Sequence, residues 1–140
     1  MKAITFLNQI YKTDKMIENK LAEVEKLKSI AMGIGGADNE KVKSSGKSDK
    51  IADLVSRYVD LEREIEADID KLIRLRKDVI SVIERLKVDE YDLLHKVYVQ
   101  NLTLGEAAYQ MGKSYTWATT THKRAKAKVQ KILDERTGNT

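Results

Sequence analysis

The stretch TLGEAAYQMGKSYTWATTTHKRAKAKVQKIL, residues 103–133, decides the fold of this chain. Within it, Thr103 stands three positions before Glu106, which is the spacing of a capping box. In that motif the threonine hydroxyl accepts the Glu106 N–H, and the glutamate carboxylate accepts the Thr103 N–H. The pair therefore predicts the start of a short helix, which we place at 104–111.

A glycine and a serine separate this short helix from the next one. Gly112 favours the left-handed backbone conformation that ends many helices, because it has no Cβ. Ser114 is a preferred cap for the amino end of a second, longer helix, which we place at 114–133. A short helix, a glycine turn and a longer basic helix together predict a helix-turn-helix.

Small and apolar residues indicate how these two helices pack. Ala108, Gly112 and Ala118 supply the small side chains that a close helix crossing requires. The residues predicted to complete the packing are Leu104, Ala107, Met111, Thr121 and Ala125. Two placements remain open for Trp117, against the preceding helix or against a DNA backbone.

The opposite face of the second helix is rich in hydroxyl groups. In a helix-turn-helix this face enters the major groove, where hydroxyls bond bases or phosphates and threonine methyls pack on thymine methyls. The predicted groove-face residues are Ser114, Tyr115, Thr116, Thr119, Thr120 and Lys123. Phosphate contacts are predicted for Lys113, Arg124, Lys126 and Lys128. The predicted partner is therefore double-stranded DNA.

The charge distribution agrees with a polyanion partner. Residues 93–133 contain seven Lys or Arg and one acidic residue, Glu106, whereas the rest of the chain has a net charge of −2. A basic carboxyl-terminal third attached to a nearly neutral front part indicates a polyanion-binding module with a separate attachment.

Heptad patterns dominate the first part of the chain. Apolar residues recur every seven positions in two segments, and a Gly/Ser-rich segment at 33–48 separates them. The first series is Ile10, Ile17, Val24 and Ala31 with Leu7 and Leu21, and the second is Ile51, Tyr58, Ile65, Leu72, Val79 and Leu86. These patterns predict an all-α chain with a long antiparallel helical hairpin, a coiled coil, followed by the helix-turn-helix.

The predicted boundaries follow from these patterns. The coiled-coil arm spans residues 1–87, with helices at about 3–32 and 49–87 joined by the linker 33–48. The helix-turn-helix domain spans 88–140, and its first helix runs from the cap Asp89 to about Gln100. No feature of the sequence decides whether the long helices pair within one chain or between two chains.

One register of the hairpin sets two carboxylates against each other. If the heptads are aligned, Val24 faces Tyr58, Leu21 faces Leu61 and Asp14 faces Asp68. Because like charges repel, each aspartate then needs a lysine or water partner, or one of them is protonated. Polar residues in such a seam usually fix its register.

Other chemistries lack the residues that they need. The chain has no Cys, and its two His are far apart, so we predict no metal site and no cofactor. Gly46-Lys47-Ser48 and Gly112-Lys113-Ser114 match the end of a P-loop but lack its upstream glycine, and we predict no enzyme. There is no apolar run of membrane-spanning length and no signal-peptide pattern, which predicts a cytoplasmic protein without a membrane partner.

Several motifs resemble region 4 of bacterial sigma-70-type factors, the part that reads the −35 promoter element. They are TLGEAA at 103–108, MGKS at 111–114 and KRA at 123–125. The whole chain is similar to small sigma-region-4-like proteins of phages and prophages of Gram-positive bacteria, which are grouped with late-gene activators and autolysin regulators. The chain departs from the sigma motif at Lys113, Ala118 and Thr121, where aliphatic residues are usual. The resemblance implies promoter DNA and host RNA polymerase as partners.

We therefore expect a DNA-binding transcriptional regulator of the phage type, an activator of late genes whose helix 114–133 reads the major groove. Its coiled-coil arm would form a homo-oligomer or contact RNA polymerase. The alternative is a protein-interaction module that binds and modifies host RNA polymerase without sequence-specific DNA binding. The long apolar seam and the scarcity of arginines and glutamates on the groove face motivate that alternative.

Overall fold

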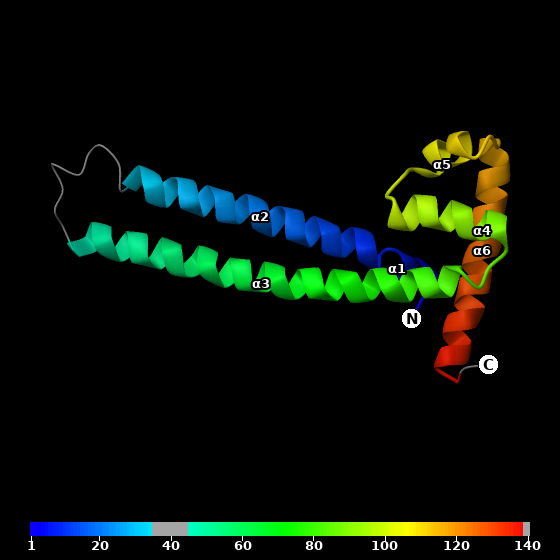
Figure 1. Cartoon of the computed structure of the whole chain (residues 1–140), viewed down its shortest axis with the longest axis horizontal. Coiled ribbons are helices and arrows are strands. Elements are labelled where there is room, and N and C mark those ends of the chain that lie inside the picture. Colours follow the sequence, from blue (N-terminus) through cyan, green and yellow to red (C-terminus); the bar gives the residue numbers. More distant parts are fainter. Residues whose placement is uncertain (35–44, 139–140) are drawn as a thin grey trace. The chain divides into compact units, whose positions relative to one another are not determined.

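The computed structural model describes residues 1–34 and 45–138, and all the elements in these ranges are helices. In chain order they are α1 (Ala3–Leu7), α2 (Gln9–Ile34), α3 (Ser45–Ile83), α4 (Val88–Leu94), the π-helix η2 (His95–Val99), α5 (Leu104–Gln110) and α6 (Tyr115–Arg136) (Figure 1). The all-α prediction is confirmed. None of the described helices combines the length and the apolar character that crossing a membrane demands.

The chain forms two compact units. Unit 1 contains Met1–Thr13 and Leu72–Thr140, and unit 2 contains Asp14–Lys71. The predicted arm, residues 1–87, contributes residues to both units. Unit 1 includes both ends of the predicted arm, because apolar residues of these ends pack in the same core as α4 and α6.

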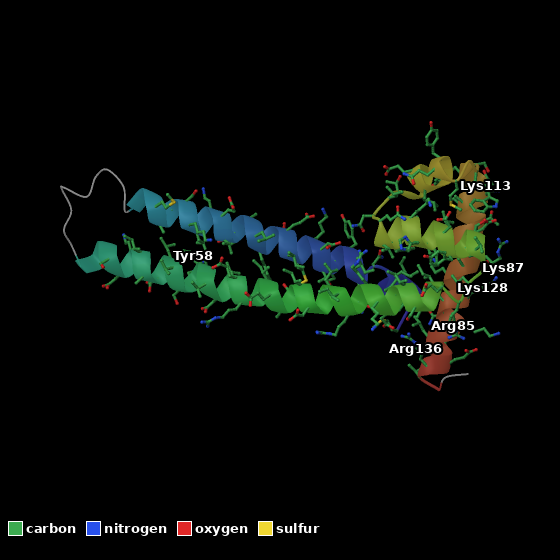
Figure 2. The ribbon with its side chains drawn as sticks, in the orientation of Figure 1. Tyr58, Arg85, Lys87, Lys113, Lys128 and Arg136 are labelled. Atoms are coloured by element: carbon green, nitrogen blue, oxygen red, sulfur yellow. The ribbon has the colours of Figure 1, made fainter. Side chains whose placement is uncertain are left out.

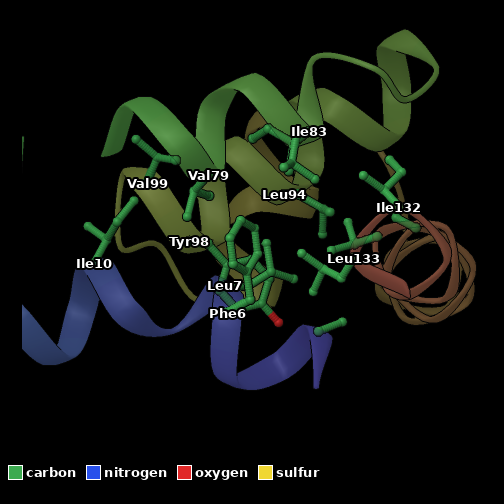
Figure 3. Packing of buried hydrophobic residues seen from close by; sticks show 14 residues of the cluster. Phe6, Leu7, Ile10, Val79, Ile83, Leu94, Tyr98, Val99, Ile132 and Leu133 are labelled. Carbon is green, nitrogen blue, oxygen red and sulfur yellow. The ribbon is translucent and has the colours of Figure 1, made fainter. Parts of the chain in front are cut away.

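The core of unit 1 is built from segments at opposite ends of the chain (Figure 3). Leu7 of α1, Ile10 of α2 and Val79 of α3 are fully buried there. The other members drawn from α3 onward include Ile83, Leu94, Tyr98, Val99, Ile132 and Leu133. An ion pair adds to this packing, since Arg136 Nη2 lies 2.7 Å from Asp78 Oδ1. The heptad residues at the two ends of the arm thus serve this core.

A second, smaller cluster joins α4, α5 and α6. Its buried members are Leu93, Ala107, Ala108 and Ala118, with Val97, Leu104, Met111 and Trp117 packed against them. The packing predicted for Ala108 and Ala118 is therefore confirmed. Trp117 is half-buried on this cluster, whereas Tyr115 is 61% exposed. Of the two placements left open for Trp117, the structure therefore shows the one against the preceding helices.

The long helices begin and end at positions other than those predicted. The predicted helix 3–32 is divided, because α1 ends at its cap Asn8 and α2 begins at Gln9. The predicted helix 49–87 is α3, which covers Ser45–Ile83 and ends where the Arg85 N–H turns back to the Val82 carbonyl. Residues 35–44 of the predicted linker 33–48 lie outside the described residues, and its ends belong to α2 and α3. Heptad spacing continues across both helix ends, so it does not mark them.

The predicted helix 89–100 also differs from the structure. It consists of α4 and then the π-turn of η2, in which the Gln100 N–H bonds to the His95 carbonyl at 2.9 Å. The predicted cap Asp89 lies inside α4, and the cap residue is Lys87. This shift occurs because the Glu90 carboxylate accepts the Lys87 N–H at 3.3 Å.

In unit 2, ion pairs connect α2 with α3. Lys20 Nζ lies 2.7 Å from Asp68 Oδ2, and Lys28 Nζ lies 3.4 Å from Glu62 Oε2. The residue further along α2 therefore pairs with the residue earlier in α3. The two helices thus run in opposite directions within this unit (Figure 1). The hydrogen bond to Asp68 raises the pKa of Lys20. Asp68 therefore has a lysine partner, which is one of the arrangements predicted to relieve repulsion between Asp14 and Asp68.

The predicted seam of unit 2 is only partly buried. Val24, Leu27 and Ile65 are buried there, but Leu21 is 48% exposed. Lys28 Nζ lies 5.3 Å from the centre of the Tyr58 ring, the residue that the predicted register assigns to Val24. The ammonium group of Lys28 thus lies over an aromatic face that the heptad pattern assigns to an apolar partner.

Candidate nucleic-acid interface

Side-chain caps fix the starts of α5 and α6. Thr103 Oγ1 accepts the Glu106 N–H at 3.1 Å, and Glu106 Oε1 accepts the Thr103 N–H at 3.0 Å. This confirms the predicted capping box. The bond from the Thr103 N–H lowers the pKa of Glu106. Ser114 Oγ accepts the Trp117 N–H at 3.0 Å, so the cap predicted for the second helix is also confirmed.

The turn between α5 and α6 depends on Gly112, whose φ is +66°. The Gly112 N–H bonds to the Tyr109 carbonyl at 3.1 Å, and the Lys113 N–H bonds to the Ala108 carbonyl at 2.9 Å. These two bonds form a Schellman motif, which satisfies carbonyls at the end of α5. The left-handed turn predicted for Gly112 is therefore confirmed, and it sets the direction in which α6 leaves.

Gly112→Ala is expected to lower the free energy of unfolding of unit 1 by about 1–2 kcal/mol, because L-residues with a Cβ disfavour the left-handed region. No atom lies within 4 Å of the added Cβ, so the penalty comes from the backbone alone. Urea unfolding followed by the fluorescence of Trp117, the chain's single tryptophan, measures it. Gly112→Asn is the control and should lose less, because asparagine tolerates this region. Equal losses for both variants would contradict the explanation.

The predicted division of α6 into a packed face and a free face agrees with its burial. Ala118, Thr121 and Ala125 are almost completely buried. The six residues predicted for the groove face are all exposed: Ser114, Tyr115, Thr116, Thr119, Thr120 and Lys123. Thr119 Oγ1 donates to the Thr116 carbonyl at 2.9 Å, which leaves its oxygen able to accept a bond from outside. The exposed face therefore presents methyl and hydroxyl groups together.

Three of the four cations predicted to bind phosphate differ in their surroundings. Lys126 is half-buried and takes part in none of the ion pairs between described residues. Lys113, which is labelled in Figure 2, has its Nζ 5.3 Å from the centre of the Trp117 ring. Arg124 belongs to a different group, because it binds a carboxylate of α4.

Arg124 and Lys128 both bind Glu90, which is only 1% exposed. Arg124 Nε lies 3.0 Å from Glu90 Oε2, and Lys128 Nζ lies 2.9 Å from Glu90 Oε1. The phosphate contacts predicted for these two cations stay a prediction, and their ion pairs with Glu90 are an additional role that the sequence did not indicate. Both have an intramolecular partner, although the Arg124 side chain is 55% exposed. The sequence signal was an acidic residue at the start of a helix, which is common in caps and does not identify a distant partner.

The charge state of Glu90 depends on these contacts. Burial raises the pKa of its carboxyl, but hydrogen bonds from Lys128, Arg124 and the Lys87 backbone outweigh burial, so the pKa lies below its ordinary value. Glu90 is therefore ionised at neutral pH. One carboxylate holds two cations of α6 against α4, which fixes the rotation of α6 about its own axis.

A second buried polar pair joins η2 to α6. The Tyr98 hydroxyl lies 2.5 Å from His122 Nε2, and the two rings are stacked with centres 5.7 Å apart. Burial lowers the pKa of His122, and the positive charge of Lys126 lowers it further. Burial also raises the pKa of Tyr98. His122 is thus a neutral structural group between helices, a role that its position in the sequence did not indicate.

A shallow hollow of about 500 Å³ lies beside the groove face. It runs between the start of the chain and α6, and its lining residues are Lys2, Ala3, Ile4, Lys123, Lys126, Ala127 and Gln130. Gln130 connects its two sides, because its Oε1 accepts the Ala3 N–H at 2.7 Å and its Nε2 donates to the Met1 carbonyl at 3.1 Å. Two of the three lysines that line this hollow, Lys123 and Lys126, also belong to the predicted DNA-binding set.

In comparisons with known proteins, no family model, no curated protein and no solved structure matches this chain.

Proposed function

We propose that unit 1 binds double-stranded DNA through a helix-turn-helix of the sigma-70 region 4 type, in which α5 and α6 are the two helices. The amino-terminal half of α6 enters the major groove. The observation that carries this proposal is the exposed hydroxyl-rich face of α6, directly opposite its packed face of Ala118, Thr121 and Ala125. This division leaves one face of the helix free, and the major groove of DNA is wide enough to admit an α-helix.

Each part of this surface has a distinct role in the proposal. The hydroxyls of Thr116, Thr119 and Thr120 bond base edges or phosphates, and their methyls pack on thymine methyls. Lys113 and Lys123 bind backbone phosphates, which supplies affinity without sequence information. The capped start of α6 at Ser114 directs backbone N–H groups toward the same duplex.

The rest of the chain completes the proposal. The two long helices form an antiparallel coiled-coil hairpin that joins two copies of the protein or contacts RNA polymerase. A second copy would raise affinity through effective concentration, because one such module makes few base contacts. The proposed role is that of a phage or prophage regulator of transcription that activates late genes, as the similarity of the chain to small sigma-region-4-like phage proteins implies.

The test is a salt titration of binding to duplex DNA taken from the neighbourhood of the gene. Lys123→Ala should reduce the slope of log affinity against log salt by about one, because one phosphate contact is lost. Arg124→Ala should reduce it less, since the charge of Arg124 is already shared with Glu90. Lys26→Ala is the matched control, because Lys26 is an exposed lysine of unit 2 and its loss leaves the slope unchanged. Failure of the wild-type protein to bind any such duplex at low salt would overturn the proposal.

One observation favours the second candidate function, a module that binds host RNA polymerase. The hollow beside α6 has apolar groups of Ala3, Ile4 and Ala127 on its surface and lysines around them, which suits an acidic segment with an apolar side chain. Ile4 is 38% exposed there. Under this alternative, Ile4→Glu abolishes capture of the polymerase, and duplex binding by the wild-type protein is weak and unspecific.

A further inference from the structure

A second hollow, of about 280 Å³, lies at another corner of unit 1. It is bounded by the turn after α3 and by the carboxyl-terminal half of α6. Its lining residues are Arg85, Leu86, Lys87, Lys128, Lys131, Ile132 and Glu135, and Figure 2 labels Arg85, Lys87 and Lys128. Four cations thus surround one small space, together with one carboxylate.

Backbone and side-chain contacts hold two sides of this hollow in place. The Arg85 N–H bonds to the Val82 carbonyl at 3.1 Å, and the Leu86 N–H bonds to the Ile83 carbonyl at 3.0 Å, so the turn is fixed to the end of α3. On the other side, the bond to Glu90 orients Lys128. The hollow is therefore a formed feature of unit 1.

The positive charge of the hollow is largely unbalanced. Lys128 is paired with Glu90, but Arg85, Lys87 and Lys131 take part in none of the ion pairs found among residues 1–34 and 45–138. Like charges gathered at one place repel one another unless an anion is present. Arg85, Lys87 and Lys131 are exposed, so an anion from solution can reach all three.

We infer that this hollow binds a phosphate group, held by Arg85, Lys87 and Lys131. A planar guanidinium beside ammonium groups is the set of donors that proteins use for phosphate, because the guanidinium pairs two oxygens and each ammonium acts as a compact charge. A volume of about 280 Å³ accommodates a phosphate group and several waters, each of which occupies about 30 Å³. That the DNA backbone supplies this phosphate group rests on the proposed function. That the hollow binds a phosphate group does not depend on it.

The first arm of the test uses inorganic phosphate and pyrophosphate without DNA. Titration of the full chain should shift the amide NMR signals of residues 85–88 and 128–132. Arg85→Gln/Lys131→Gln should weaken this binding at least tenfold, since two of its three free cations are lost. Glu135→Gln should strengthen it by roughly two- to fivefold, because an exposed carboxylate at the rim repels the anion. Lys26→Gln/Arg57→Gln is the control, with the same change of net charge on exposed residues of unit 2.

The second arm uses duplex DNA and separates the two sources. If the backbone supplies the phosphate, Arg85→Gln/Lys131→Gln lowers the salt slope by about two, and the control variant leaves it unchanged. If DNA does not bind at all while phosphate still shifts the signals, a free phosphate compound is the ligand, and the proposed function is the part that fails. A third outcome would contradict this inference. In it, the salt slope of DNA binding depends on Lys123 but not on Arg85 and Lys131, and phosphate shifts no amide signal of residues 85–88 and 128–132. The proposed function would then stand without the phosphate site.

Discussion

Leu7→Ala is expected to lower the free energy of unfolding of unit 1 by about 2–5 kcal/mol, the range for buried leucines truncated in a core. Leu7 is fully buried in α1, where it contacts the cluster that includes Val79 and Leu94. Removal of its side chain leaves a cavity among segments that are held in place from several directions. Urea unfolding followed by Trp117 fluorescence reports on unit 1 and measures the loss.

Leu21→Ala is the matched control for this prediction. Leu7 and Leu21 have the same heptad position, so a uniform coiled-coil arm would make their truncations similar in cost. Leu21 lies in unit 2, so its variant is also followed by helical circular dichroism, and because Leu21 is 48% exposed its truncation should change the free energy of unfolding by no more than about 0.5 kcal/mol. A loss for Leu21→Ala as large as that for Leu7→Ala would mean that the arm, and not the core of unit 1, determines the effect.

Arg124→Met/Lys128→Met is expected to cost about 3–5 kcal/mol at neutral pH, because it leaves a buried carboxylate without either cation. The pH dependence should also change sign. In the wild-type protein the pKa of Glu90 lies below the pKa of an ordinary glutamate. The stability that ionised Glu90 contributes is therefore fully present at a pH above the ordinary pKa, and it is lost as the pH falls through the lowered pKa. In the variant, burial raises this pKa and only the Lys87 backbone bond opposes it, so stability should fall as the pH rises from about 4 to 7.

Unfolding by urea across this pH range, in the wild-type protein and the variant, tests the prediction. Adding Glu90→Met to the double variant should recover most of the stability and remove the falling pH profile, since an apolar side chain of similar length then fills the site. If the double variant keeps the wild-type profile, Glu90 is hydrated in solution and does not orient α6. DNA binding by the triple variant would separate the orienting role of Glu90 from the direct role of the two cations.

Local chemistry explains what the sequence could predict. Three local motifs were predicted correctly: the capping box at Thr103, the cap at Ser114 and the turn at Gly112. Within each motif the interacting residues lie no more than five positions apart in the sequence. The same holds for the packed and free faces of α6, because helical periodicity separates Ala118 from Thr119. These features needed no knowledge of distant segments.

Long-range contacts explain what the sequence could not predict. Nothing in the periodicity of Leu7 distinguishes it from Leu21, because the difference lies in which segments surround each one. Likewise the sequence position of Glu90 is that of an ordinary acidic residue in the first turn of a helix. Only the tertiary fold brings Arg124 to within 3.0 Å of it. The first hollow and the second were missed for the same reason, since each is lined by residues from separate parts of the chain.

The hydrogen bond from the Ala3 N–H to Gln130 spans 127 positions of the chain, and this separation has a consequence for the order of folding. Contacts so far apart form slowly, because the entropy of a long loop is lost before they stabilise anything. During synthesis α6 emerges after the helices that precede it in the chain, and until then the apolar side chains of α1 lack part of their core. The core of unit 1 is therefore incomplete until α6 has been synthesised, and a product truncated before α6 should be prone to aggregation.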